Sequence, residues 1–304
     1  MNGICEIPVA FGPAQSLFGV VATPANGERG KVACLMFNAD ATHRVGPGRI
    51  HVKLARQLAE RGVTSLRFDL SGRGDSDAAY GAEHALTQGV QDLQAAMDRL
   101  EGMMGIHRFI VIGLRTGARS GLGLAVADAR VVGLVMFDGF AFPGRRSRWD
   151  RRLRRMAAIA ARPSAIAGTF QALARKPSSR AAVPASAPFG PDRPEITMAL
   201  FRRSMTQLAE RGVAVLLLYS GSVHVVDHDR DQLGPLAHEP GLREVDYRFM
   251  PGIDQGLISI AAQQSFMAVV GDWVLRLTSR RATARPERLA RPALPVERVV
   301  LRTA

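Results

Sequence analysis

Residues 109–118 read FIVIGLRTGA, an apolar segment that runs through two glycines into a stretch of small residues. Residues 109–112 are all apolar, which predicts a strand buried on both faces of a parallel sheet. Residues 117–127 predict a small-residue helix. Gly113 and Gly117 permit a sharp turn between strand and helix, so the side chain of Arg115 is expected to project at the end of the strand.

Strand and helix patterns alternate on both sides of this stretch. Upstream, strands are predicted at 17–23, 32–37 and 64–70, with helices at 49–61 and 86–100. Downstream, strands are predicted at 131–137, 213–219 and 245–250, with helices at 196–211 and 261–277. Gly62 and Gly212 are expected to end two of the helices. The alternation predicts an α/β fold, a mostly parallel, doubly wound sheet whose functional residues gather at the carboxyl ends of the strands.

The composition is that of an ordinary globular chain. Its 304 residues are 47% hydrophobic and 22% charged, which excludes a wholly disordered chain. There is no apolar run of membrane-spanning length, and the first residues lack the pattern of a secretory signal, so neither is expected. The two cysteines are too few for a disulfide framework or a cysteine zinc site and suit a reducing compartment. The expectation is a cytoplasmic protein.

The net charge of +13 is concentrated in two segments. Residues 144–203 hold fourteen basic side chains against three acidic ones, and residues 280–304 hold seven against two. We therefore divide the chain into a core at 1–143 and 204–279, a basic helical cap insertion at 144–203, and a basic Pro/Arg-rich tail at 280–304. The excess of arginine has two interpretations of equal weight: compositional bias, or a surface that faces an anionic partner.

The start of the cap places Trp149, Leu153 and Met156 between arginines. This pattern fits an amphipathic helix on an anionic membrane surface or on an acidic carrier. The favoured alternative is a cap helix that turns its apolar side to the pocket and its arginines to solvent. Nucleic-acid binding is not expected, because the basic segments contain few aromatic residues for stacking. The sequence does not indicate an oligomeric state.

The turn at 113–117 has the spacing G-x-nucleophile-x-G of the nucleophile elbow in α/β hydrolases. Three further segments carry a family resemblance: NADATHRVGPGRIHVKLARQLAERGVTSLRFDLSGRGDSD at 38–77, LLYSGSVHVVDHDRDQ at 217–232 and PGIDQGL at 251–257. Together they resemble serine-aminopeptidase-like α/β hydrolases, especially those that accompany bacterial exosortase and exopolysaccharide systems. The resemblance covers roughly residues 15 to 278. It implies an α/β-hydrolase fold with a helical cap.

Two catalytic positions depart from that family. The elbow residue, Ser or Cys in such enzymes, is Arg115 here, and the Asp-His pair that supplies the general base is Asp254-Gln255. A guanidinium stays protonated in proteins and cannot attack a carbonyl, and an amide cannot accept the proton of a nucleophile. The loss of both groups predicts a site that no longer uses Ser/Cys–His chemistry.

A relocated catalytic group is the alternative. Thr116 and Ser120 follow the elbow residue, although the resemblance assigns Thr116 a backbone oxyanion role and Ser120 is expected to pack inward. His224 and His228 lie with Asp227 and Asp229 near the position of the family's catalytic acid; of these, His228 and Asp227 are candidates for the site. A solvent-exposed role is the favoured interpretation of His228.

An anion-binding pocket is the second hypothesis for this site. The backbone of Thr116 and the loop Asn38-Ala39-Asp40 would form the oxyanion hole, and Arg115 would stand at a helix N-terminus, which attracts anions. An acidic residue (Asp40, Asp138 or Asp254) or a ligand carboxylate or phosphate is expected to neutralise Arg115. The simpler and favoured interpretation is that Arg115 fills an inactive site by pairing with one of these acids.

His43 matches a family motif together with Arg44, and either orders the oxyanion loop or contacts substrate. Asp69 and Asp75 are interpreted as residues that shape a turn behind the site. The histidines and acids show no metal-ligand spacing, and the glycines at 72 and 74 do not form a dinucleotide fingerprint. No metal or cofactor is expected.

The sequence thus supports two hypotheses about function. The first is a non-catalytic or non-classical accessory protein that binds a small acyl or anionic ligand, in exopolysaccharide or related metabolism. The alternative is an active hydrolase or acyltransferase that acts on an ester, amide or thioester with a relocated nucleophile.

Overall fold

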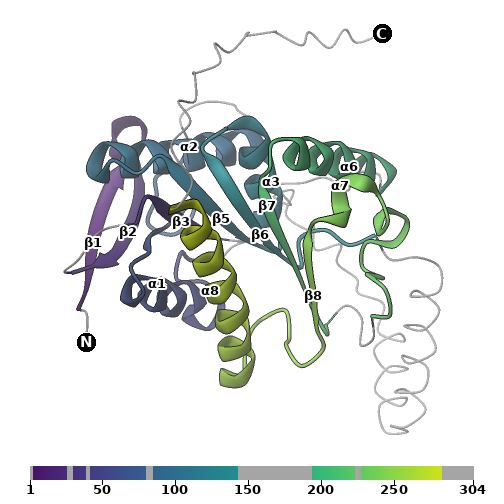
Figure 1. Cartoon of the computed structure of the whole chain (residues 1–304). Coiled ribbons are helices and arrows are strands. Elements are labelled where there is room, and N and C mark those ends of the chain that lie inside the picture. Colours follow the sequence, from purple (N-terminus) through teal and green to yellow (C-terminus); the bar gives the residue numbers. More distant parts are fainter. Residues whose placement is uncertain are drawn as a thin grey trace, which may run out of the picture.

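The described part of the chain is built around one twisted sheet (Figure 1). The computed structural model describes residues 3–25, 30–38, 42–79, 85–142, 194–222 and 227–282. Within them the sheet has eight strands in the order β1-β2-β4-β3-β5-β6-β7-β8. The strands are β1 (Ile4–Phe11), β2 (Leu17–Pro24), β3 (Val32–Phe37), β4 (Thr64–Phe68), β5 (Arg108–Leu114), β6 (Val131–Phe137), β7 (Ala214–Ser220) and β8 (Asp246–Met250).

The sheet is parallel from β4 to β8 and antiparallel at one end. β4, β3, β5, β6, β7 and β8 pair in parallel, whereas β2 pairs antiparallel with both β1 and β4. Every residue of β3 and of β6 is buried, as expected for strands covered on both faces. The predicted α/β class with a mostly parallel sheet is confirmed.

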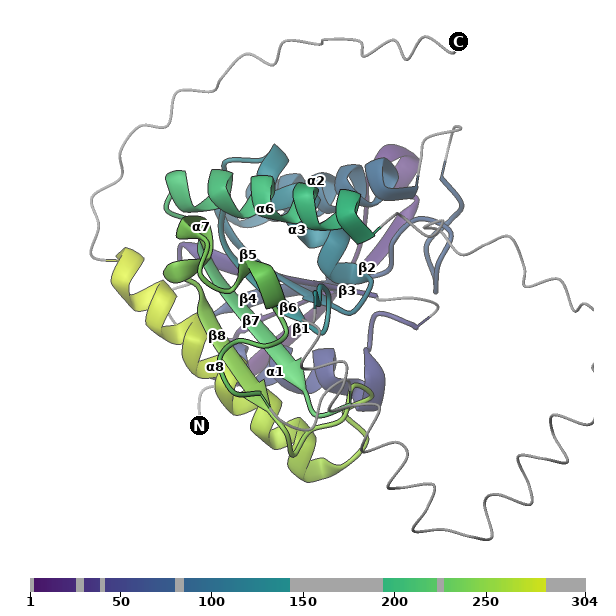
Figure 2. The same ribbon diagram turned by 90° about the vertical axis from the view of Figure 1, so that its right-hand side faces the viewer.

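Helices cover both faces of the sheet (Figure 2). Helices α2 (Ala85–Met104), α3 (Gly117–Ala127) and α6 (Pro194–Glu210) pack on one face, and α1 (Ile50–Glu60) and α8 (Ile260–Ala282) pack on the other. Successive residues of each strand point to opposite faces, so β3 contributes Leu35 and Phe37 to the first core and Cys34 and Met36 to the second. The apolar strands thereby supply two separate cores.

The predicted helix ends are also found. Gly62 follows α1 with φ +85° and Gly212 follows α6 with φ +63°, a left-handed conformation that glycine adopts at helix C-termini without strain. The short segments η1 (Pro13–Gln15), η2 (Pro47–Arg49), η3 (Gly234–Leu236) and α7 (Pro240–Arg243) complete the described elements. Among them, no helix is long and apolar enough to cross a membrane.

The sequence patterns did not predict β1. It runs antiparallel to β2 along their full length and forms one edge of the sheet. Pro8 lies within it, and proline is tolerated there because an edge strand leaves one side of its backbone unpaired. Elsewhere the differences are small: β4 ends at Phe68 rather than at 70, and α2 and α8 extend four and five residues beyond their predicted ends.

The predicted cap and tail fall mostly outside the described residues. Residues 143–193, which include Trp149, are not among them, and residues 283–304 are not either. The last ten residues assigned to the cap, 194–203, belong to α6, which packs against α3. The division into cap and core therefore stays a prediction. The two cysteines are free, Cys34 in the core and Cys5 on the surface.

One ion pair links the antiparallel end of the sheet to its interior. Arg67 of β4 is 6% exposed, and its Nη1 lies 2.9 Å from Oε1 of Glu6 on β1. The other carboxylate oxygen of Glu6 accepts a hydrogen bond of 2.7 Å from Arg56 of α1. These two arginines hold the pKa of Glu6 below its ordinary value, Arg56 through its hydrogen bond more than Arg67 through its charge, although partial burial opposes them. Glu6 therefore neutralises a guanidinium that the sheet encloses.

We predict that Glu6→Gln lowers the free energy of unfolding by about 3 kcal/mol, because it leaves Arg67 buried without a counter-charge. Urea unfolding at pH 7 measures this change. Arg56→Gln is the control: it removes an exposed partner of the same carboxylate and should cost less than about 1 kcal/mol. Equal losses in the two variants would contradict the account.

Candidate functional site

The turn after β5 has the sharp geometry that its glycines predict. Arg115 adopts φ +49°, a left-handed conformation that is strained for a residue with a side chain. Its backbone N–H donates to the carbonyl of Phe137 at 2.7 Å, and its carbonyl accepts from the N–H of Ala118 at 3.1 Å. A Cβ on Gly113 would lie 2.8 Å from the Cα of Ala118, so the turn can close only around glycine. Arg115 is half-buried at the head of the sheet.

The end of β6 packs directly against this turn. A Cβ on Gly139 would overlap the Cβ of Ala118 and would lie 3.3 Å from the carbonyl oxygen of Arg115. The preceding residue, Asp138, is also left-handed, with φ +49°. Burial raises the pKa of Asp138, while two hydrogen bonds from Ser220 and the nearby positive charge of Arg115 act in the opposite direction. Asp138 is thus an acidic neighbour of Arg115.

The other two acids considered for Arg115 differ in position. Asp40 lies outside the described residues, as does Ala39. The carboxylate oxygens of Asp254 each accept the backbone N–H of Ile258 at 3.2 Å, so Asp254 stabilises its own turn before α8.

A chain of hydrogen bonds runs from Asp138 toward the base position. Ser220, at the end of β7, donates its backbone N–H to Asp138 Oδ1 at 2.9 Å and its hydroxyl to Oδ2 at 2.6 Å. The hydroxyl of Ser220 accepts the N–H of Ser222 at 3.3 Å, and the hydroxyl of Ser222 accepts the N–H of Gln255 at 2.8 Å. Hydroxyl and carboxylate groups thus connect the elbow and base positions. The sequence patterns did not single out Ser220 or Ser222, although both follow a predicted strand.

Asp227 and His228 belong to a different set of contacts. Asp227 accepts hydrogen bonds from the hydroxyl of Tyr247 and, at 2.8 Å, from the backbone N–H of Asp231. Burial, and then the bond to Asp227, raise the pKa of Tyr247. His228 is exposed, and its backbone N–H donates to Asp231 at 3.2 Å. These contacts organise the loop between β7 and β8.

The five described histidines have no contact of a kind that would activate a hydroxyl. The rings of His43, His107 and His238 lie beside carboxylates, and the ring of His51 bonds to a backbone carbonyl. The ring of His228 has no hydrogen bond or ion pair in the described part of the chain. His84 and His224 are outside that part. A Ser–His or Thr–His pair is therefore not formed among the described residues.

A cavity of about 250 Å³ lies beside the elbow. Its lining combines two predicted site residues, Asn38 and Thr116, with hydroxyl, amide and charged groups from the β4–α2 connection and from α2 and α3. The lining residues are Asn38, Leu70, Ser71, Arg73, Ala79, Ala85, Gln88, Gly89, Asp92, Thr116, Gly117 and Ser120. The structure thus places Asn38 and Thr116 in the wall of one cavity, and their oxyanion role stays a prediction.

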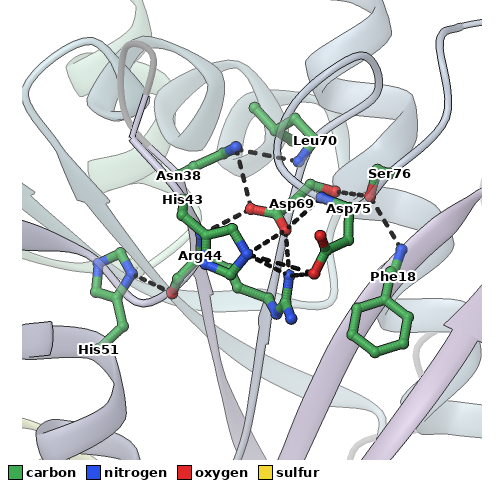
Figure 3. Close-up of polar contacts among 9 residues, drawn as sticks. All are labelled: Phe18, Asn38, His43, Arg44, His51, Asp69, Leu70, Asp75 and Ser76. Carbon is green, nitrogen blue, oxygen red and sulfur yellow. Dashed lines mark hydrogen bonds and ion pairs between the residues drawn. The ribbon is translucent and has the colours of Figure 1, made fainter.

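A buried carboxylate contacts Asn38 in the wall of this cavity and also Arg44 (Figure 3). The side chain of Asp69 is fully buried and accepts from the backbone N–H of Arg44 at 2.6 Å and from Asn38 Nδ2 at 3.3 Å. The guanidinium Nη1 of Arg44 lies 2.6 Å from both Asp69 and Asp75, and Arg44 also stacks over the ring of Phe18 at 4.6 Å. The interpretation of Asp69 and Asp75 as turn residues agrees with these contacts.

His43 joins the same cluster. Its Nε2 lies 3.4 Å from Asp75 and 3.5 Å from Asp69. Ligand atoms of His43, Asp69 and Asp75 lie within 4.8 Å of one another, a convergence that the sequence spacing did not reveal. However, Nη1 of Arg44 contacts both carboxylates and approaches Nε2 of His43 to 2.7 Å. The arginine side chain therefore occupies the position of a cation, and the donor set does not fit a metal ion.

The overall fold agrees with known structures. A protein from Klebsiella pneumoniae named as a dienelactone hydrolase superimposes with a TM-score of 0.56 at 14% identity, covering 92% of this chain and 100% of its own. The chain has the α/β-hydrolase fold. Est1E from Butyrivibrio proteoclasticus matches with a TM-score of 0.55 at 15% identity, covering 90% and 99% of the two chains. A protein from Agrobacterium tumefaciens described as an α/β hydrolase matches with a TM-score of 0.53 at 15% identity, covering 93% and 100%.

No protein-family model and no curated protein matches the sequence. At such low identity the similarity to solved structures shows the fold alone. The residues at the elbow and base positions must therefore be interpreted from their own contacts.

We predict that this protein loses stability as the pH falls from about 6.5 toward 4 because of His51. Its ring is buried at the start of α1, its Nδ1–H donates to the carbonyl of Arg44 at 3.1 Å, and burial lowers its pKa to about 4. Between these pH values the imidazole binds a proton in the unfolded chain but not in the folded chain. This difference lowers the free energy of unfolding by about 3 kcal/mol over the whole range.

Urea midpoints measured between pH 7 and pH 4 test this prediction. His51→Gln retains an N–H donor but cannot titrate, so its stability should decline less steeply over this range. His107→Gln, at an exposed histidine, should decline as the wild type does. If His51→Gln were as acid-sensitive as the wild type, another group would be responsible.

Proposed function

We propose that this protein is an α/β-hydrolase-fold homologue that binds an anionic or acyl ligand at the elbow without forming an acyl-enzyme. One observation carries the proposal: Arg115 occupies the strained elbow position with Asp138 beside it. The fold keeps the geometry that presents a side chain to a ligand, but the side chain presented is a cation. A guanidinium pairs with carboxylate or phosphate in a bidentate arrangement, which suits recognition and not nucleophilic attack.

The base position supports the same proposal. Gln255 is anchored by its backbone to Ser222, and the hydrogen bonds that continue to Asp138 contain no imidazole. Such a chain stabilises the loops at the head of the sheet. It lacks a group that takes a proton near neutral pH and returns it to a leaving group.

The wider setting is proposed on sequence grounds. The resemblance at 38–77, 217–232 and 251–257 favours a role beside exopolysaccharide or related metabolism. Two free cysteines are in keeping with a cytoplasmic location. The basic segment 144–203 is proposed as the surface that meets an anionic membrane or an acidic carrier.

The alternative is a hydrolase or acyltransferase with a relocated nucleophile. Its specific support is that the cavity beside the elbow is lined by Thr116 and Ser120. The solved structures named above include one called a dienelactone hydrolase, so the fold is compatible with this chemistry.

We predict that the wild type neither hydrolyses p-nitrophenyl acetate nor reacts with a fluorophosphonate probe. The single variant Arg115→Ser should also be inactive, because it has a hydroxyl nucleophile but no general base. Arg115→Ser combined with Gln255→His should hydrolyse the ester at least about 100-fold faster than the single variant, the usual contribution of a general base. Turnover by the wild type that disappears in Thr116→Ala or Ser120→Ala would establish the alternative instead.

We also predict that octanoate and inorganic phosphate bind more weakly to Arg115→Gln than to the wild type, by about tenfold or more, since a charge-assisted hydrogen bond is lost. Isothermal titration calorimetry measures both affinities. Arg203→Gln, which removes an exposed arginine on α6, is the charge-matched control and should bind as the wild type does. Equal weakening in the two variants would show only a general effect of net charge.

A further inference from the structure

A second hollow adjoins the cavity beside the elbow. It is a groove of about 940 Å³ between the β1–β2 connection and one face of α2. Figure 1 shows these elements at the antiparallel end of the sheet. Its lining residues are Ala10, Phe11, Gly12, Pro13, Gln15, Gln88, Gln91, Asp92, Gln94, Ala95, Asp98, Arg99, Gly102 and Met103. Gln88 and Asp92 line both hollows, so the groove and the cavity that holds Thr116 and Ser120 lie next to each other.

Most polar groups in this combined surface are neutral and can both donate and accept. They are four glutamines, one asparagine and three hydroxyl residues: Gln15, Gln88, Gln91, Gln94, Asn38, Ser71, Thr116 and Ser120. The formal charges balance, with Arg73 and Arg99 against Asp92 and Asp98. The surface therefore has no net attraction for an ion of either sign.

Two side chains show that the cavity end is built for polar contact. Asp92 is 3% exposed and is held by Ser71, whose hydroxyl and backbone N–H both donate at 2.8 Å, and by Gln88 Nε2 at 2.8 Å. Ser120 is 5% exposed and lines the cavity. A hydroxyl in the wall of a cavity can both donate to and accept from a ligand or water there.

We propose that the groove and cavity together bind an uncharged, hydroxyl-rich chain, namely a short neutral oligosaccharide, with one end at Ser120. Sugar hydroxyls donate and accept at once, as do the amides and hydroxyls of this surface. Phe11, Ala95 and Met103 supply apolar area for the C–H faces of a sugar ring. The site adjoins the anion pocket proposed for Arg115 and shares Asn38 and Thr116 with it, whereas Arg115 itself lines neither hollow.

Saturation-transfer NMR and calorimetry on the full chain test this inference with maltose to maltohexaose and cellobiose to cellohexaose. One of the two series should bind, with an affinity that rises with chain length over the first few units as the chain fills the groove. Ser120→Ala at the cavity and Gln91→Ala in the groove should each weaken binding about fivefold, the effect of one hydrogen bond.

Gly89→Ala tests the cavity end by a different route. The added Cβ would lie 3.0 Å from Ser120 Oγ and narrow the cavity, while alanine keeps α2 helical. Binding should fall further than in Ser120→Ala. Thr87→Ala, an exposed change on the same helix outside both hollows, is the matched control and should bind as the wild type does.

Three results would overturn the inference. The first is that neither series binds. The second is binding that is unchanged in Ser120→Ala, Gln91→Ala and Gly89→Ala, which would place the sugar elsewhere. The third is a ligand that binds as well as or better than the neutral oligosaccharides. Tighter binding of oligogalacturonate would show that the surface selects for negative charge, and equal binding of a neutral Gly/Ser hexapeptide would show that it selects for amide groups.

Discussion

The close approach of two strand ends at the head of the sheet determines the geometry of the whole site. The turn after β5 and the residue after β6 touch where Gly113 and Gly139 leave no room for a Cβ. This contact places Arg115 and Asp138 side by side, each in a left-handed conformation that the surrounding packing maintains. In an α/β hydrolase the same strain presents a nucleophile. Here the residue in this strained conformation is Arg115, whose side chain is a cation.

Buried charges help to maintain this geometry. Asp69 is fully enclosed, and its carboxylate is satisfied by the backbone and guanidinium of Arg44 and by Asn38. Asp138 is likewise satisfied by Ser220. Removing one member of such a set leaves an uncompensated charge, which costs far more than the set contributes in net stability. These residues are therefore constrained by folding, whatever the site does.

The two hollows beside α2 separate binding from the elbow. Their lining is neutral and rich in amide and hydroxyl groups, whereas the elbow carries a guanidinium and a carboxylate a short distance away. In these proposals the protein binds an oligosaccharide at one surface and an anionic or acyl ligand at another. An accessory protein of this kind needs no nucleophile. The two proposals share Asn38 and Thr116 at the cavity, but Arg115 belongs to the first alone and Gln91 to the second alone.

The order of strands and helices followed from the sequence alone, because apolar periodicity and glycine positions reflect local burial and backbone conformation. The sequence also predicted the sharp turn around Arg115, and the assignment of Gln255 to the base position stays a prediction. It did not reveal β1, whose edge position permits a proline and weak alternation. Only the tertiary structure decided that Asp138 lies beside Arg115 and that Ser220 and Ser222 connect it toward Gln255. It alone showed that Asp92 and Ser120 line one cavity. These contacts join residues far apart in the chain, so their closeness depends on how strands and helices pack, which local pattern does not specify.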